Sequence, residues 1–87
     1  MDKTVTTFRK NTQEEVRAGI GEFKGKLYAS VRVYIENDVG EYVPTRKGLT
    51  LPVGLLPELA RCVELLCKEA INDKLVEPER FEGERGK

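Results

Sequence analysis

The clearest pattern in this chain is a strict alternation of apolar and polar positions over residues 26–36. The apolar positions are Leu27, Ala29, Val31, Val33 and Ile35. A period of two is typical of a half-buried strand, so this stretch is predicted to be the central strand of a sheet. Its other side carries Tyr28 and Tyr34 interleaved with cations, which is a surface suited to the bases and phosphates of a single strand.

Three more strands are predicted from composition and alternation. They are residues 4–10, rich in Thr and Val, residues 14–22, which alternate again, and residues 41–51, which Pro44 interrupts at an edge or bulge position. Short turns join these strands, and that arrangement predicts an antiparallel meander with one face that needs a cover.

In the second strand, the alternation places Arg17, Gly19, Gly21 and, one step further, Phe23 on the outward side. Two glycines on one side of a strand either leave a strip that a backbone or a ligand approaches closely, or mark a bend or bulge. The pattern alone does not decide between these two interpretations.

After Pro52 the apolar residues recur at spacings of three and four. They are Leu55, Leu56, Leu59, Cys62, Val63, Leu66, Cys67 and Ala70. This spacing predicts an amphipathic helix that begins between Val53 and Pro57. Its wide apolar arc is expected to cover the sheet and to contact a second subunit. The predicted fold class is therefore α+β, a four-stranded antiparallel curved sheet followed by one C-terminal amphipathic helix (β-β-β-β-α), in a homodimer.

A chain of 87 residues has room for one small domain, and dimerisation would add to its core. Residues 1–3 are predicted to be a flexible N-terminus, residues 4–72 the domain, and residues 73–87 a charged, disordered tail. The sequence has neither an apolar run that would span a bilayer nor a signal peptide. We therefore expect a cytoplasmic protein, nucleoid-associated in a bacterial host and nuclear in a eukaryotic one.

The charges balance overall, with 15 Lys and Arg against 15 Asp and Glu, which argues against binding of nucleic acid by bulk attraction. Their distribution is uneven. Residues 1–51 hold nine basic and seven acidic residues, a net charge of +2, whereas residues 52–87 hold six and eight, a net charge of −2. The sheet half therefore has the sign that a surface facing nucleic acid needs.

The sequence offers little to an enzyme. It has no histidine, no Gly-rich phosphate loop and no thiolate with a base beside it. Cys62 and Cys67 are five residues apart on the predicted helix, about 140° around it, which suits neither a disulfide nor a metal ion. Both are expected in the core or at the dimer interface. No catalytic residue, cofactor or metal site is therefore predicted.

Four short motifs follow one another along the chain. They are Phe-Lys-Gly-Lys at 23–26, Val-Arg-Val-Tyr at 31–34, Gly-Glu at 40–41, and Pro-Thr-Arg-Lys-Gly-Leu-Thr-Leu at 44–51 before the helix. In this order and at these separations, the chain from Val5 to Ala70 resembles the Positive Cofactor Four family of transcriptional coactivators. The resemblance implies a homodimer whose two curved sheets bind single-stranded DNA.

The resemblance also implies roles for individual residues. Phe23 is similar to a ring that stacks on a base, with Lys24 and Lys26 as its phosphate contacts. Arg46 and Lys47 resemble the basic pair of the fourth strand, and Arg32 resembles an arginine of the central strand. Lys24, Lys26, Arg46 and Lys47 are expected to cluster at adjoining turns, because a groove that follows a phosphate backbone needs several cations in a row.

Ile35 departs from the family pattern, because family members usually carry Trp there as a second stacking platform. Its loss is expected to weaken binding, since one base stack contributes about 1–3 kcal/mol. Tyr28, Tyr34 and Tyr42 are candidate substitutes, but alternation places Tyr34 on the opposite face from Ile35.

These observations predict a non-enzymatic protein, similar to a transcriptional cofactor, that binds single-stranded DNA with little sequence preference. RNA is left open as a ligand, and the other expected partners are a second copy bound through the helix and proteins of the transcription machinery, with no membrane. The predicted binding residues are Arg17, Phe23, Lys24, Lys26, Arg32, Tyr34, Arg46 and Lys47. The competing hypothesis is a homodimeric protein-interaction module that regulates transcription without direct nucleic-acid binding.

Overall fold

The computed structural model describes residues 2–78, so residues 79–87 of the predicted tail lie outside the described residues. The chain divides into two compact units, Met1–Leu56 and Pro57–Lys87. The first unit contains the sheet and the second contains nearly all of the helix.

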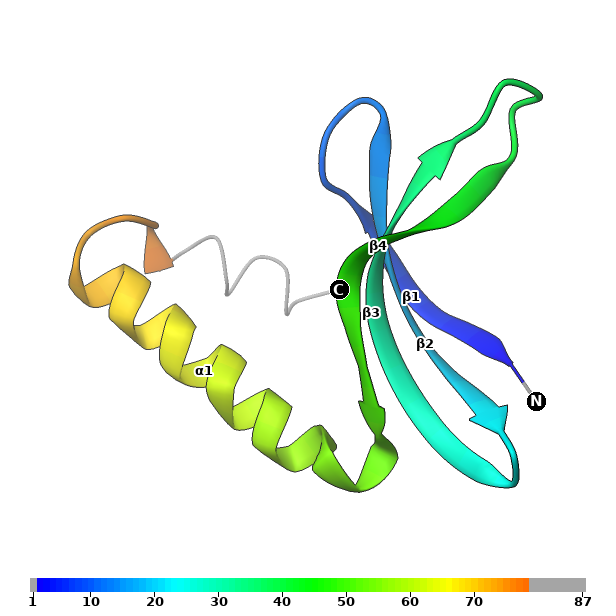
Figure 1. The fold of residues 1–87 in the computed structure, drawn as a ribbon. Coiled ribbons are helices and arrows are strands. Elements are labelled where there is room, and N and C mark those ends of the chain that lie inside the picture. The colour runs from blue at the N-terminus through cyan, green and yellow to red at the C-terminus, as the bar shows by residue number, and fades with distance from the viewer. Residues whose placement is uncertain (1, 79–87) are drawn as a thin grey trace. The chain divides into compact units, whose positions relative to one another are not determined.

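The elements follow the predicted order of four strands and one helix (Figure 1). The strands are β1 (Lys3–Arg9), β2 (Glu14–Phe23), β3 (Lys26–Glu36) and β4 (Tyr42–Pro52). A short 3-10 turn, η1 (Val53–Leu55), leads into the helix α1 (Leu56–Asn72). The sheet order is β1-β2-β3-β4 with every pair antiparallel, so the predicted meander and the α+β fold class are confirmed.

The register divides the sheet into two faces, because directly paired residues on neighbouring strands point to the same side. The face that we call the apolar face carries Val16, Ala18, Ile20, Leu27, Ala29, Val31, Val33, Ile35, Val43, Leu49 and Leu51. The face that we call the aromatic face carries Arg17, Gly19, Gly21, Phe23, Lys26, Tyr28, Ser30, Arg32, Tyr34, Tyr42, Pro44, Gly48 and Thr50. The alternation predicted for residues 26–36 is therefore confirmed.

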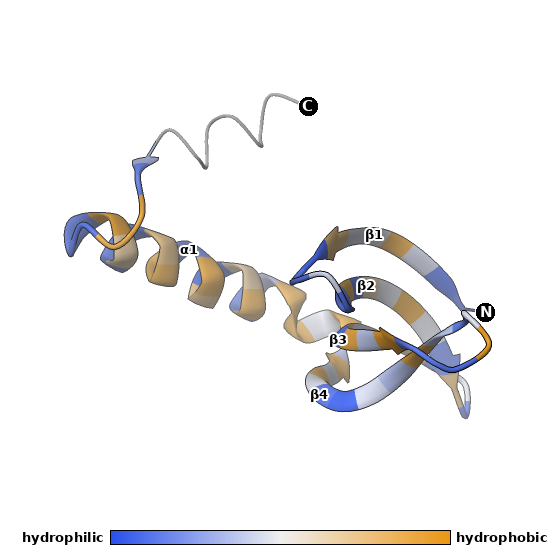
Figure 2. Ribbon diagram, turned by 90° about the horizontal axis from the view of Figure 1, so that it is seen from above, coloured by the Kyte–Doolittle hydropathy of each residue, from blue (hydrophilic) through white to orange (hydrophobic). Residues whose placement is uncertain are grey.

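Little of this apolar surface is buried in the single chain. Among the described hydrophobic residues, only Ala29 is buried, with 7% of its surface exposed. Leu27 and Leu49 on the apolar face remain 44% and 40% exposed. Figure 2 shows apolar and polar residues alternating in bands along the strands and the helix. A single chain thus leaves much of its apolar surface accessible to water, an arrangement that costs hydrophobic stabilisation.

The turns have clear causes in the sequence. Lys24 and Gly25 both have positive φ, 53° and 80°, as a two-residue type I′ hairpin turn between β2 and β3 requires. In the turn before β4, the side chain of Asn37 accepts hydrogen bonds from the backbone N–H groups of Val39 and Glu41 at 3.0 and 2.9 Å. The asparagine side chain thus accepts hydrogen bonds from backbone N–H groups that the tight turn would otherwise leave without a partner.

One of the two glycines on β2 is explained by the neighbouring strand. β1 has a bulge at Val5, between Thr4, which pairs with Gly19, and Thr6, which pairs with Ala18. A Cβ atom on Gly19 would lie 2.6 Å from the carbonyl oxygen of Lys3. Gly19 therefore allows the β1 backbone to approach, which favours the interpretation of a bulge with a close backbone neighbour.

β4 contains a larger irregularity, which we call the β4 bulge, formed by Thr45, Arg46 and Lys47 between the paired residues Pro44 and Gly48. Pro44 at its start confirms the interruption predicted from the sequence. Gly48 has a φ of 145°, and a Cβ atom there would lie 2.4 Å from the carbonyl oxygen of Val31. Only glycine satisfies both conditions, so β4 can rejoin the ladder at this residue.

The helix α1 begins at Leu56, inside the predicted interval, and Pro57 occupies its first turn, where an amide hydrogen has no partner in the helix. Its end is closed by Lys74 with a φ of 60° and by a hydrogen bond of 2.8 Å from the N–H of Leu75 to the carbonyl of Ala70. No residue of α1 is buried, and Leu66 is 68% exposed. The apolar side of this helix is thus available to a partner.

Candidate nucleic-acid interface

The aromatic face begins at the β2–β3 hairpin with an exposed ring. Phe23 is the last residue of β2, pairs with Lys26, and has 63% of its surface exposed. The ammonium group of Lys24 lies 5.3 Å from the centre of the Phe23 ring, within range of a cation–π contact. The outward direction predicted for Phe23 is therefore confirmed, and both lysines of the motif lie beside it.

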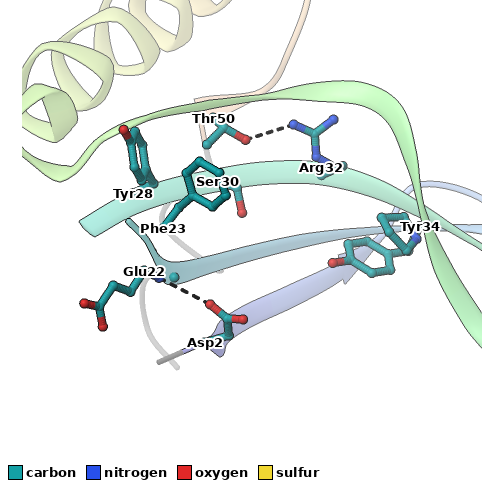
Figure 3. A pocket seen from close by; sticks show the side chains of 10 residues that line it. Asp2, Glu22, Phe23, Tyr28, Ser30, Arg32, Tyr34 and Thr50 are labelled. Carbon is teal, nitrogen blue, oxygen red and sulfur yellow. Dashed lines mark hydrogen bonds between the residues drawn. The ribbon is translucent and has the colours of Figure 1, made fainter. Parts of the chain in front are cut away.

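An open groove of about 400 Å³ extends from this hairpin along the aromatic face (Figure 3). It is lined by Asp2, Gly21, Glu22, Phe23, Tyr28, Ser30, Arg32, Tyr34, Pro44 and Thr50. Figure 3 shows the rings of Phe23 and Tyr28 towards one end and the ring of Tyr34 at the other. Tyr28 is paired with Gly21, so no side chain stands opposite its ring on β2. The groove therefore combines flat aromatic rings with polar groups on one face of the sheet.

Arg32 lies in the middle of the groove, and its guanidinium is already partly engaged. Its Nη1 donates a hydrogen bond of 3.1 Å to the carbonyl oxygen of Thr45, and its Nη2 donates one of 2.9 Å to Oγ1 of Thr50. The side chain thus connects β3 to the β4 bulge across the aromatic face. Arginine has more donors than these two bonds use, so Arg32 retains capacity for a phosphate.

The four cations implied by the family resemblance do not lie at adjoining turns, and the prediction that they cluster there is wrong. Lys24 and Lys26 belong to the β2–β3 hairpin, whereas Arg46 and Lys47 lie in the β4 bulge opposite Val33. Lys26 and Val33 are seven positions apart on β3, which is about 23 Å along a strand. The cause is the antiparallel register of β3 and β4, in which Pro52 pairs with Tyr28 near the hairpin and the preceding residues of β4 lie beside the interior of β3.

Lys47 also turns away from Phe23. Its ammonium group lies 3.6 Å from Oε2 of Glu14, which pairs with Ile35 on the side of the apolar face. Oε1 of Glu14 also accepts a hydrogen bond of 2.7 Å from Asn11 and lies 3.3 Å from the ammonium group of Lys10. The hydrogen bonds from Asn11 and Lys10 lower the pKa of Glu14 below its ordinary value of 4.5. Arg46 is exposed, and within residues 2–78 it has no hydrogen-bond or ion-pair partner.

Around Tyr34, at the far end of the aromatic face, four side chains form what we call the arginine–tyrosine cluster. Its members are Arg9, Arg17, Tyr34 and Tyr42. The Cζ atom of Arg17 lies 4.5 Å from the ring centre of Tyr34 and 5.4 Å from that of Tyr42. Arg9 lies 5.6 Å from the ring of Tyr42 and donates a hydrogen bond of 2.8 Å to its hydroxyl. These contacts bring together side chains from all four strands.

Arg17 and Tyr34 are among the predicted binding residues, whereas Arg9 is not. Simple alternation from Thr4 along β1 would put Arg9 on the other side of the sheet. The bulge at Val5 reverses that parity, so that Arg9 pairs with Glu15 on the aromatic face. Nothing in the residue pattern of β1 marks this bulge; the only signal is Gly19 on the neighbouring strand.

No helix within residues 2–78 is long and apolar enough to cross a membrane. The same residues contain no group of three or more His, Cys, Asp or Glu side chains that could hold a metal ion.

The open four-stranded antiparallel sheet, the single C-terminal helix and the row of rings and cations on one face define a small α+β protein with a candidate nucleic-acid surface. The chain belongs to the PC4 family, whose model, described as Transcriptional Coactivator p15 (PC4), matches residues 4–61. The resemblance to the Positive Cofactor Four family is thus confirmed. At the level of the family, this membership supports a DNA-binding, coactivator-like role.

Solved structures agree with this assignment. A PC4 homologue from Burkholderia pseudomallei K96243 is similar with a TM-score of 0.72 and 25% identity, over 77% of this chain and 98% of that protein. The bacteriophage T5 homologue of the eukaryotic coactivator PC4, implicated in recombination-dependent DNA replication, has a TM-score of 0.66 and 20% identity, over 97% of this chain and 93% of that one. The second likeness shows the fold alone. A comparison with curated proteins gives no match.

Proposed function

We propose that this protein binds single-stranded nucleic acid, DNA in the first place, with little sequence preference and in a role similar to that of a transcriptional cofactor. The observation that carries the proposal is the exposed ring of Phe23, flanked by Lys24 and Lys26, at the end of an open groove on the aromatic face. Family membership adds support, because the fold is that of proteins described as transcriptional coactivators.

The binding mode follows from the chemistry of these side chains. A base stacked on an aromatic ring contributes about 1–3 kcal/mol whatever its identity, because every base has a flat face. Lys24 and Lys26 stand where the phosphates next to such a base would pass, and Arg17, Arg32 and Arg46 lie further along the sheet. Contacts to rings and phosphates carry no sequence information, which gives low sequence preference.

Ile35 does not supply a second stacking platform on this face. It lies on the apolar face, 39% exposed, whereas Tyr34 lies on the aromatic face with its ring beneath Arg17. Stacking therefore rests on Phe23, with Tyr28 as its neighbour in the groove. Asp2 adds a negative charge to the same groove, so we expect a modest affinity for each protomer.

A homodimer is part of this proposal. The apolar face and the helix leave large side chains exposed in the single chain, including Leu27, Leu49 and Leu66. Surfaces of this kind on a small protein mark a protein–protein contact, because exposure of contiguous apolar area is unfavourable. A second copy would cover them and would place two aromatic faces in one molecule, so that one strand could contact both.

The test is fluorescence polarisation of a labelled single strand of about 16 nucleotides, titrated with wild type and with Phe23→Ala at low and physiological salt. We expect wild type to bind the single strand, to bind a duplex of the same sequence much more weakly, and to lose about tenfold in affinity on Phe23→Ala. Phe8→Ala is the matched control, because Phe8 is 62% exposed but pairs with Val16, on the side of the apolar face.

The competing protein-interaction module predicts the opposite salt response. Binding to phosphates weakens steeply as salt rises, whereas an aromatic contact with a protein changes little. If wild type fails to bind any single strand at low salt, the nucleic-acid proposal is overturned, and the aromatic face becomes a candidate surface for protein partners.

A further inference from the structure

In the arginine–tyrosine cluster, guanidinium groups lie over the aromatic rings, whereas the ring of Phe23 at the other end of the groove is exposed. The ring of Tyr34 is covered by the guanidinium of Arg17, and the ring of Tyr42 lies near both Arg17 and Arg9. A ring whose face is occupied by a guanidinium is not free to stack on a base. The contact instead restricts the guanidinium, which otherwise has several rotatable bonds and loses conformational entropy when it binds a ligand.

Two polar contacts fix the cluster further. Nε of Arg17 donates a hydrogen bond of 2.5 Å to Oε2 of Glu15, whose side chain is only 18% exposed. Arg9 donates to the hydroxyl of Tyr42 at 2.8 Å. Each of these bonds engages one edge of a guanidinium and leaves the other donors of that group unused among the described residues. Two arginine side chains are thus held in place with donors still available.

The charges around the cluster favour an anion. Glu15 offsets one of the two positive charges, and Arg9, which is exposed, has no ion-pair partner in the described part of the chain. Glu36 also lies on this side, because it pairs with Tyr42, but its carboxylate is directed towards the turn, since Oε2 lies 3.6 Å from where a Cβ atom of Gly40 would be. Asp2 lines a hollow together with Arg17 and Tyr34, and its Oδ1 accepts a hydrogen bond from the N–H of Glu22. The guanidinium of Arg9 is therefore the uncompensated charge of the cluster.

From these contacts we infer that Arg9 and Arg17 form a phosphodiester-binding subsite, and that Tyr34 and Tyr42 act as positioning residues that hold the two guanidinium groups. This inference rests on the proposed function, because the phosphodiester belongs to the single strand that stacks on Phe23. Planar guanidinium groups held in a fixed orientation suit the paired oxygens of a phosphate better than mobile lysines do.

The position of the subsite defines a path for the bound single strand along β3. Tyr34 and Lys26 are eight residues apart on β3, which is about 26 Å along a strand. The groove lies between them on the same face. A single strand stacked on Phe23 and running along β3 would therefore reach Arg32 and its paired neighbour Arg17 after several nucleotides, and Arg9 just beyond them.

The test measures how the affinity for a single strand of about 16 nucleotides depends on salt, in wild type, Arg9→Ala, Tyr42→Leu, Phe23→Ala and the control Lys3→Ala. Lys3 suits as a control because it removes the same charge from the same strand, while its pairing with Ile20 puts it on the side of the apolar face. Circular dichroism confirms that each variant is folded before binding is measured.

We expect the slope of log affinity against log salt to fall by about 0.7 in Arg9→Ala, the value for one phosphate contact on a single strand. Lys3→Ala should keep the wild-type slope. Tyr42→Leu should lose about threefold to tenfold in affinity although no charge is removed, because the freed guanidinium groups must be ordered on binding.

The outcomes separate this inference from the proposed function. If Phe23→Ala weakens binding but Arg9→Ala keeps the wild-type slope, or changes it no more than Lys3→Ala does, the protein binds single strands without this subsite and the inference is overturned alone. If wild type binds no single strand at all, the inference and the proposed function fall together. Inhibition of wild type by millimolar inorganic phosphate, with an unchanged slope in Arg9→Ala, would also overturn the assignment to a phosphodiester.

Discussion

The guanidinium of Arg32 donates a hydrogen bond of 3.1 Å to the carbonyl oxygen of Thr45, and this contact ties the central strand to the β4 bulge. The Thr45 hydroxyl reinforces it with a hydrogen bond of 2.8 Å to the carbonyl of Val33. The conformation that exposes Arg46 thus depends on polar contacts from β3. Arg32 supports the interface as well as lying within it.

The double role of Arg32 predicts a loss of stability. Arg32→Ala removes the donors to Thr45 and Thr50 and should lower the free energy of unfolding by about 1.5–3 kcal/mol, the range for a hydrogen bond that involves a charged group. Urea denaturation measures this change. The control is Arg46→Ala, which removes an exposed arginine of the same bulge and should change stability by less than about 0.5 kcal/mol while weakening binding of the single strand. Equal stability of the two variants would contradict the structural role of Arg32.

The glycine of the Arg-Lys-Gly motif gives a second prediction. Gly48→Ala places a Cβ atom 2.4 Å from the carbonyl oxygen of Val31 and forces alanine to a φ of 145°. We expect a loss of more than about 2 kcal/mol, because strained backbone alone costs about 1–3 kcal/mol and the overlap adds to it. Thermal unfolding measures this loss. Gly54→Ala is the matched control, since nothing lies within 4 Å of a Cβ atom there and its φ is not positive. A Gly48 variant as stable as the Gly54 variant would show that β4 tolerates another register.

The proposed homodimer predicts the effect of a charge on the helix. Leu66 is 68% exposed on α1, and Leu66→Lys should dissociate the dimer if the apolar side of the helix forms the contact. Sedimentation equilibrium gives the mass of wild type and variant directly. Lys68→Glu changes a charge two residues away on the polar side of the same helix and should leave the mass unchanged. A wild-type mass of one chain at every concentration would contradict the homodimer.

The elements of the fold follow closely from the sequence, because each one repeats a simple period. The alternation at residues 26–36 predicts β3 to the residue, and the spacing of three and four after Pro52 predicts α1. The exposed position of Phe23 follows from the same parity. These predictions depend only on neighbours along the chain, so no long-range contact was needed to make them.

The site was less predictable, because the pairing between strands decides which side chains meet. The bulge at Val5 brings Arg9 to the aromatic face, and the antiparallel register of β3 and β4 places Arg46 and Lys47 far from the β2–β3 hairpin. A one-residue bulge such as that at Val5 shifts the parity of every residue beyond it. The position of such a bulge depends on the neighbouring strand, because Gly19 of β2 is what lets the β1 backbone approach. The residue pattern of β1 alone therefore does not predict it.

The carboxylate of Glu14 predicts how stability depends on pH. Hydrogen bonds from Asn11 and Lys10 lower its pKa in the folded protein below the ordinary value of 4.5. A group whose pKa is depressed by folding stabilises the protein fully above its unfolded pKa, and this stabilisation is lost as the pH falls through the folded pKa. We therefore expect the thermal midpoint of wild type to fall as the pH is lowered below 4.5, when the contacts of Glu14 with Lys10 and Lys47 are neutralised.

Glu14→Gln isolates this contribution, because the amide keeps the size of the side chain but has no charge to lose. At neutral pH the variant should be less stable than wild type, since neither lysine is paired with a carboxylate. As the pH falls below 4.5, the two midpoints should converge, because wild type then carries a neutral side chain as well. Glu64→Gln serves as the control, since Glu64 is 52% exposed in its pair with Arg61, and exposed pairs contribute little. A constant difference between wild type and Glu14→Gln from neutral pH to well below 4.5 would show that the ionisation of Glu14 is not what holds the loop before β2 to the β4 bulge.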